Sequence, residues 1–171
     1  RETIAHSDFP VLRNEVQRES AIGNFVTDAM KFSAERVLDQ PIDIAVQANG
    51  AIRSDIEPGT EVWNEGEITF YDMMMAFGLG SGDDGSPGYP LVSFYLTEGE
   101  VRNALEVSVL LSELLGDNYF LQFSGLNMVY NPERAVLFTI PFSGTPLPSS
   151  RSVLSAELVD EGQTRALRKD S

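Results

Sequence analysis

Hydrophobic residues follow a helical period in two long stretches of the chain. Across residues 23–38 apolar side chains recur every three or four positions, which predicts an amphipathic helix with Asn24 as its N-cap and an end before Pro41. The second stretch opens with Thr97-Glu-Gly-Glu100, the spacing of a capping box, in which threonine and glutamate side chains satisfy two free backbone N–H groups. This stretch predicts a helix that ends near Leu115.

Short runs rich in β-branched and aromatic residues predict the strands. They lie at Ile42–Val46, Leu91–Leu96, Leu121–Ser124, Asn127–Tyr130, Leu137–Ile140 and Val153–Val159. Thr69-Phe-Tyr-Asp72 again has capping-box spacing and predicts a short helix through Met75, whereas the glycine-rich stretch Gly78–Pro90 predicts a surface loop. Helices interleaved with strands, followed by a run of strands, favour an α+β domain with a mixed sheet and packed helices.

Composition narrows the class of protein. With 171 residues, 42% of them hydrophobic and 22% charged, the chain can form one globular domain over residues 1–171 with its own core. It has no apolar run of the length that crosses a bilayer, so no membrane span is predicted. The formal net charge of −14 would repel a phosphate backbone, which argues against a nucleic-acid partner. The abrupt start at Arg1, with no signal peptide before it, is typical of a fragment of a longer chain.

Residue counts exclude several kinds of active site. His6 is the one histidine and there is no cysteine, so a zinc site, a His/Asp di-metal cluster and a Ser-His-Asp triad are not expected on this chain. The glycines of Gly78–Gly82 are not followed by Lys-Ser or Lys-Thr, which argues against a phosphate-binding loop. No cofactor is therefore predicted on these residues.

Two arginines are candidates for binding an anion. Arg53 follows a predicted buried strand and the turn at Asn49-Gly50, so its guanidinium would project from a sheet edge, where it could clamp a phosphate or carboxylate. Arg18 directly precedes the first predicted helix. For both, the sequence allows a plainer alternative, a salt bridge to an acidic neighbour: Asp55 or Glu57 for Arg53, and Glu15 or Glu19 for Arg18.

One aromatic residue is a candidate for stacking on a flat ligand. Phe77 closes the apolar run Met73–Phe77 and precedes Gly78, so its ring could present a face at the end of the short helix. Stacking a nucleobase on such a ring contributes about 1–3 kcal/mol. The alternative is an ordinary buried aromatic side chain, since methionine-rich runs most often belong to the core.

Taken together and in this order, several short segments resemble the C-terminal domain of the 5'-nucleotidase / UDP-sugar hydrolase family. They are Arg18-Glu19 with Gly23-Asn24 and Asp28-Ala-Met30, the turn Asn49-Gly-Ala-Ile-Arg53, the lead-in Gly66-Glu-Ile-Thr69 with Asp72, the pair Phe77-Gly78, and the strand Gln122-Phe-Ser-Gly-Leu126. The resemblance spans roughly residues 3–160 and is most specific in the first hundred. It implies the α+β fold of that domain.

The resemblance also implies a function. In the family, this domain recognises the nucleoside part of the substrate, while a pair of divalent metals lies in a separate N-terminal metallophosphoesterase domain of the same polypeptide. Carried over residue by residue, Arg18 would contact phosphate, Phe77 would stack on the base, and Asn49 and Arg53 would also bind the nucleotide. The resemblance further implies that the isolated chain is inactive and that the parent protein is periplasmic, cell-surface or secreted.

The sequence departs from the family pattern in four places. The turn before Arg53 is one residue shorter, the proline before the Phe77 position is replaced by Ala76, an insertion at Gly80–Pro90 delays the next strand, and a late Gly-Gly-Asp-Gly-Phe/Tyr motif is missing. The lost proline, the insertion and the missing motif favour an alternative, a catalytically inactive structural or interaction module that keeps the fold. A third interpretation, a free-standing small-molecule binder, would need a complete pocket joining Phe77 and Arg53.

Overall fold

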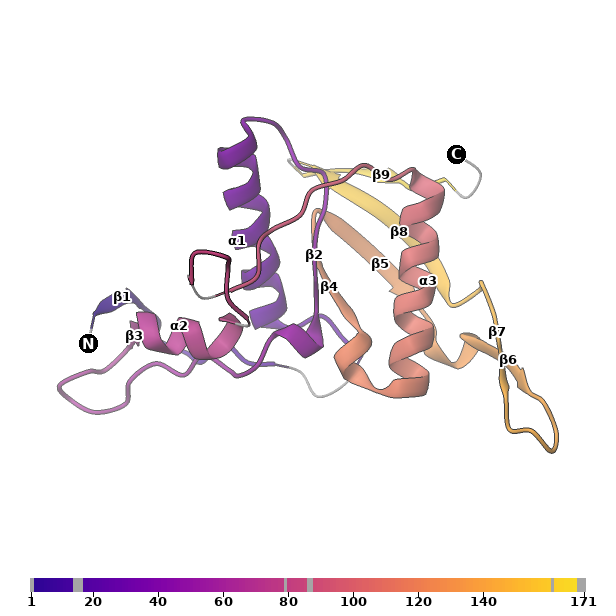
Figure 1. Ribbon diagram of the computed structural model, residues 1–171, viewed down its shortest axis with the longest axis horizontal. Helices are drawn as coiled ribbons and strands as arrows, with labels where there is room; N and C mark the ends of the chain where they lie inside the picture. Colours follow the sequence, from indigo (N-terminus) through magenta and orange to yellow (C-terminus); the bar gives the residue numbers. More distant parts are fainter. Residues whose placement is uncertain (1, 14–16, 79, 86–87, 161, 169–171) are drawn as a thin grey trace.

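Two long helices stand on either side of a central pair of strands. The computed structural model describes residues 2–13, 17–78, 80–85, 88–160 and 162–168. In Figure 1, α1 (Ala21–Leu38) and α3 (Glu98–Leu115) flank β2 and β4, and β5 and β8 lie behind α3. The short helix α2 (Phe70–Phe77) lies at the foot of α1, beside the strands that come first in the chain.

All strand pairs in the described residues are antiparallel. The strands are β1 (Thr3–His6), β2 (Ala45–Ala48), β3 (Glu67–Thr69), β4 (Leu121–Ser124), β5 (Leu126–Tyr130), β6 (Val136–Thr139), β7 (Pro146–Pro148), β8 (Val153–Asp160) and β9 (Gln163–Ala166). They form four small sheets with the orders β1-β3, β2-β4, β5-β8-β9 and β6-β7. The α+β class is confirmed, and within it the sheets are antiparallel rather than mixed.

Side-chain caps set where the helices begin. Ser20, and not Asn24, is the N-cap of α1, because its hydroxyl accepts the backbone N–H three residues further on at 3.0 Å. Asn24 lies inside the first turn, so the predicted start of this helix was too late. The two predicted capping boxes are both present: Thr69 with Asp72 at α2, and Thr97 with Glu100 at α3.

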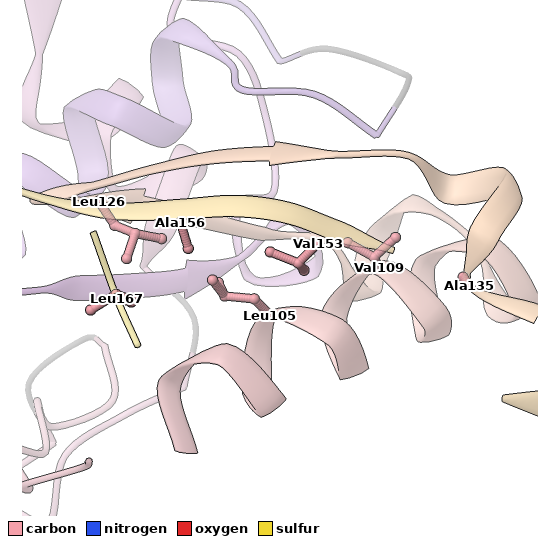
Figure 2. Packing of buried hydrophobic residues seen from close by; sticks show 7 residues of the cluster. All are labelled: Leu105, Val109, Leu126, Ala135, Val153, Ala156 and Leu167. Carbon is pink, nitrogen blue, oxygen red and sulfur yellow. The ribbon is translucent and has the colours of Figure 1, made fainter. Parts of the chain in front are cut away.

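Buried hydrophobic side chains form two separate clusters. The C-terminal cluster packs α3 against the three-stranded sheet (Figure 2) and consists of Leu105, Val109, Leu126, Ala135, Val153, Ala156 and Leu167. The N-terminal cluster joins α1, α2 and the strands near the start of the chain, and consists of Ile22, Val26, Ile52, Ile56, Ile68 and Ala76. Since burying each large aliphatic side chain contributes about 1.5–3 kcal/mol, both clusters support the fold.

One predicted strand is not formed. Leu91–Leu96 runs as extended chain outside the sheets and passes over α1 and β2 toward the start of α3 (Figure 1). Its side chains stay exposed, Tyr95 by 92%. The aromatic and β-branched composition favours a strand there, but a strand also needs a hydrogen-bonded neighbour, and none of the described strands pairs with this segment. The prediction of a strand at Leu91–Leu96 is therefore wrong.

Candidate functional site

Arg53 lies where the turn after β2 meets the end of α2. The chain leaves β2 through a 3₁₀ turn, η1 (Asn49–Ala51), and buries Ile52, which leaves Arg53 exposed beside it. The backbone N–H of Arg53 donates to the carbonyl of Ala76 at 2.7 Å, which ties the turn to the last residues of α2. The guanidinium donates to the carbonyl of Gly50 at 3.3 Å. The backbone therefore sets the position of this arginine independently of any ligand.

The alternative of a local salt bridge does not describe Arg53. Among the described residues it forms no ion pair with Asp55 or Glu57. Asp55 instead accepts the backbone N–H of Arg13 at 2.6 Å, and the Arg13 guanidinium donates to the Arg53 carbonyl at 3.1 Å. A second arginine, which the sequence did not single out, is thus held next to the first.

Both arginines line an open cleft of about 800 Å³. Its other lining residues are Ser54, Asp55, Glu57, Asp72, Met75, Asp117 and Asn118. Three of the four acidic residues already accept protein donors: Asp55 from Arg13, Asp72 within the capping box of α2, and Asp117 from Asn49. Each guanidinium carries five N–H donors, and among the described residues each gives one of them to a backbone carbonyl, which leaves donors that could face an anion in the cleft.

Asn49 is buried behind this cleft, only 6% exposed. Its Nδ2 donates to Asp117 Oδ2 at 2.8 Å, and its Oδ1 accepts from Gln122 Nε2 at 2.8 Å. The second oxygen of Asp117 is buried without a hydrogen-bond partner. The amide of Asn49 is thus engaged inside the protein and orients Asp117 at the rim of the cleft.

Arg18 has an exposed side chain, while its backbone is anchored in the interior. Its carbonyl accepts a hydrogen bond from Gln122 Nε2 at 2.8 Å. Burial raises the pKa of Tyr130, the charge of Arg18 opposes that rise, and the charge of Asp117 adds to it. Gln122 bonds to both the Arg18 carbonyl and Asn49, which in turn bonds to Asp117, so the backbone of Arg18 lies on the side of the domain where Asp117 lies.

The acidic neighbours proposed for Arg18 have different outcomes. Glu19 accepts the side-chain N–H of Asn24 at 2.5 Å, beside the N-cap Ser20. Glu15 lies outside the described residues, as do residues 79 and 86–87 of the predicted glycine-rich loop.

Phe77 is neither fully buried nor free-standing. It is the last residue of α2, directly after Ala76, whose carbonyl holds Arg53. Its half-buried ring packs against the N-terminal cluster and lies 6.4 Å from the ring of Phe25, centroid to centroid, at an interplanar angle of 48°. This packing supports the core interpretation of Phe77, and Phe77 does not line the cleft that Arg53 lines, so the stacking interpretation stays a prediction.

Two sets of hydrogen bonds and the short backbone segments between them connect the four candidate residues. Gln122 joins the backbone of Arg18 to the side chain of Asn49. Asn49 begins the turn that leads to Arg53, and Arg53 is bonded to the residue before Phe77. The candidate site also includes three residues that the sequence analysis did not propose as functional: Arg13, Asp117 and Gln122. For Gln122 the family-like strand motif gave a signal, whereas Arg13 gave none because its role depends on a contact 40 residues away.

The described residues provide no metal centre and no membrane span. No three His, Cys, Asp or Glu side chains among them gather closely enough to hold a metal ion. No described helix combines the length and the apolar character needed to cross a bilayer.

The comparisons with known proteins agree with one another on the family. The family model for the 5'-nucleotidase C-terminal domain matches residues 3–164. The 5'-nucleotidase precursor of Thermus thermophilus has a similar structure, with 24% identity, a TM-score of 0.71, and coverage of 100% of this chain and 28% of that one. The NAD nucleotidase of Haemophilus influenzae has 18% identity, a TM-score of 0.54, and coverage of 98% and 26%.

These comparisons also show how much of a relative the chain represents. It spans little more than a quarter of the length of either solved structure. No curated protein matches the chain. The structural likeness establishes the shared fold, and the match of the family model covers nearly the whole sequence. The chain belongs to the 5'-nucleotidase C-terminal domain family.

Proposed function

We propose that this chain is the nucleotide-recognition domain of a metal-dependent 5'-nucleotidase-type phosphoesterase that hydrolyses nucleoside phosphates. The observation that carries the proposal is the pair Arg13 and Arg53, whose guanidinium groups share a cleft of about 800 Å³ and each donate, within the described part of the chain, to one backbone carbonyl. The cleft also holds four carboxylates, but three of them already accept protein donors, and the two guanidinium groups are the cationic side chains of its lining that suit a phosphate group.

The other candidate residues have distinct roles in this proposal. Arg53 and Arg13 hold phosphate oxygens through charge-assisted hydrogen bonds, for which the planar guanidinium is well shaped. Phe77, next to the residue that anchors Arg53, offers the exposed part of its ring to the base. Asn49 acts from behind by orienting Asp117, and Arg18 adds positive charge nearby.

Catalysis itself belongs to another part of the polypeptide in this proposal. The divalent metal pair would be held by an N-terminal metallophosphoesterase domain, where it would activate water and stabilise charge at phosphorus. The residues described here would bind and orient the nucleotide for that domain. The names of the two similar structures, a 5'-nucleotidase and an NAD nucleotidase, support a nucleotide substrate. A periplasmic, cell-surface or secreted location is proposed with the same family inference.

The test of this function is ligand binding by the chain. Ligand-observed NMR with AMP, UMP and UDP-glucose should detect binding to the native chain. Arg53→Ala should weaken it about tenfold or more, because a charge-assisted phosphate contact is lost, and Phe77→Leu should weaken it by less. Arg134→Ala, which removes an exposed arginine outside the cleft, is the matched control and should leave binding unchanged.

The same preparation tests the proposed division of labour. Incubated with AMP and a divalent metal, the chain alone should release no phosphate. Metal-dependent release that Arg53→Ala abolishes would place catalysis on this chain and overturn that part of the proposal.

A second candidate function is a structural or interaction module without catalysis. The observation that favours it is the β6–β7 hairpin, which projects from the body in Figure 1 and exposes Leu137, Phe138 and Phe142. Exposed apolar side chains gathered on one element are typical of contacts with another protein surface. Absence of binding to all three nucleotides would favour this second function.

A further inference from the structure

Gln122 lies inside the domain and bonds to three residues in two segments, the stretch before α1 and the turn after β2. It is 2% exposed on β4. Its Nε2 donates to the Arg18 carbonyl and to Asn49 Oδ1, both at 2.8 Å, and its Oε1 accepts the Ser20 N–H at 3.1 Å. Both amide N–H groups are used. Turning the amide over would set oxygen against two oxygens and NH₂ against an N–H, so the surroundings fix one orientation.

The residues that Gln122 contacts are a candidate ligand residue, a residue of the turn before Arg53, and the N-cap of α1. The first contact is the backbone of Arg18 itself. The second contact is Asn49, which lies four residues before Arg53, begins η1 and orients Asp117. The third is Ser20, the N-cap of α1. The amide therefore fixes the distance between the backbone of Arg18 and the turn that carries Arg53.

The space for this amide requires a glycine on α1. A Cβ at Gly23 would lie 2.4 Å from Gln122 Oε1 and 2.5 Å from both Cδ and Cγ, far inside van der Waals contact. Any other residue at position 23 would push the Gln122 side chain off its three partners. Gly23 and Gln122, 99 positions apart in the chain, thus form one packing unit.

We propose that Gln122 is a positioning residue for anion recognition, which holds Arg18 and the Arg53 turn at the separation that a nucleotide phosphate requires. This inference rests on the proposed function, because it assigns Gln122 a role at the same site. Gln122 does not line the cleft, so it acts through the residues that it bonds. An apolar side chain could fill the same volume, but it could not link these segments.

The decisive variant is Gln122→Glu, which has nearly the same shape. When ionised, the carboxylate has no donor for the Arg18 carbonyl or for Asn49 Oδ1, and it faces both oxygens. When protonated, it regains one O–H donor and can restore one of the two bonds. Binding by this variant should therefore improve as the pH falls, which a loss of packing alone would not produce.

UDP-glucose is the probe, because its diphosphate has no ionisation of its own across the range used. At about pH 8 the variant should bind it about tenfold more weakly than the native chain, and at about pH 5 the difference should shrink to about threefold or less. Gln163→Glu makes the same chemical change at an exposed site on β9 and is the matched control, with binding like that of the native chain at both pH values.

The outcomes separate the two proposals. If the native chain binds none of the three nucleotides, the proposed function fails, and the inference fails with it. If the native chain binds UDP-glucose and Gln122→Glu binds it equally at every pH, the function stands and the inference is overturned. If Gln122→Glu does not fold at the higher pH, Gln122→Met carries the test, with folding checked by near-UV circular dichroism. A folded Gln122→Met variant with unchanged affinity also overturns the inference.

Discussion

At the scale of single residues, Glu106 fixes α3 against the C-terminal sheet. It is 8% exposed, and its carboxylate accepts the backbone N–H of Ser152 at 2.9 Å, the hydroxyl of Ser152, and the backbone N–H of Val153 at 3.2 Å. A carboxylate can accept all three bonds because it carries only acceptors. The entry into β8 is thereby held to the middle of α3.

Replacing this carboxylate by an amide should be costly. In Glu106→Gln the NH₂ group cannot accept the donors that face it, so at least one buried donor loses its partner. The free energy of unfolding should fall by about 1–3 kcal/mol, measured by urea denaturation. Glu113→Gln makes the same change at an exposed position on the same helix and should be nearly neutral. Equal effects of the two variants would contradict the role of Glu106.

At the scale of helices and strands, local signals were predictable and pairing was not. The capping boxes at Thr97 and Thr69 were found from sequence because each needs only residues three positions apart. The strand predicted at Leu91–Leu96 failed because its composition says nothing about which edge would pair with it. The start of α1 could be predicted only in part. Ser20 and Asn24 are both suitable N-cap residues, and tertiary contacts select Ser20.

In the candidate site, too, local sequence signals were predictable and long-range contacts were not. Arg53 and Phe77 could be singled out because they fall in short family-like segments, and of the two Arg53 lines the cleft. The partner of Arg53 could not, since Arg13 reaches it only through the pairing of the N-terminal segment with residue 56. Gln122 stands in a recognisable motif, but its bonds to residues 73 and 104 positions away exist only in the folded chain.

The capping box of α3 should make stability depend on acid pH. Hydrogen bonds from the backbone and side chain of Thr97 lower the pKa of Glu100. The folded state therefore favours the carboxylate, and this contribution is present above the ordinary glutamate pKa and lost as the pH falls through the lowered value. Urea denaturation between neutral and strongly acid pH should show a smaller decline in Glu100→Gln than in the native chain. Identical pH profiles would contradict this assignment.

At the scale of the whole molecule, charge is the dominant global feature. A net charge of −14 on 171 residues makes the folded state repel itself, and salt screens that repulsion with a Debye length of about 10 Å at 0.1 M. The two guanidinium groups of the cleft, Arg13 and Arg53, lie in this negative field. Ionic strength should therefore influence stability more than it does in a neutral domain.

Raising the sodium chloride concentration from about 10 mM to about 150 mM should raise the midpoint of thermal unfolding, because the compact state gains most from screening. Differential scanning calorimetry measures the shift, and a series with sodium sulfate at equal ionic strength separates screening from anion binding in the cleft. A lower midpoint in added salt would mean that local ion pairs outweigh the global repulsion.

The division of the hydrophobic core into two clusters has a consequence for how such a domain can change over generations. Because the N-terminal and C-terminal clusters share no member, substitutions in one should add to those in the other without strong coupling. Substitutions in the half that contains Arg53 and Phe77 could then change the ligand at some cost in the stability of that half. The C-terminal cluster, which packs α3 on its sheet, would keep the domain folded. In this fold, stability and ligand specificity could therefore evolve through substitutions in different halves of one small domain.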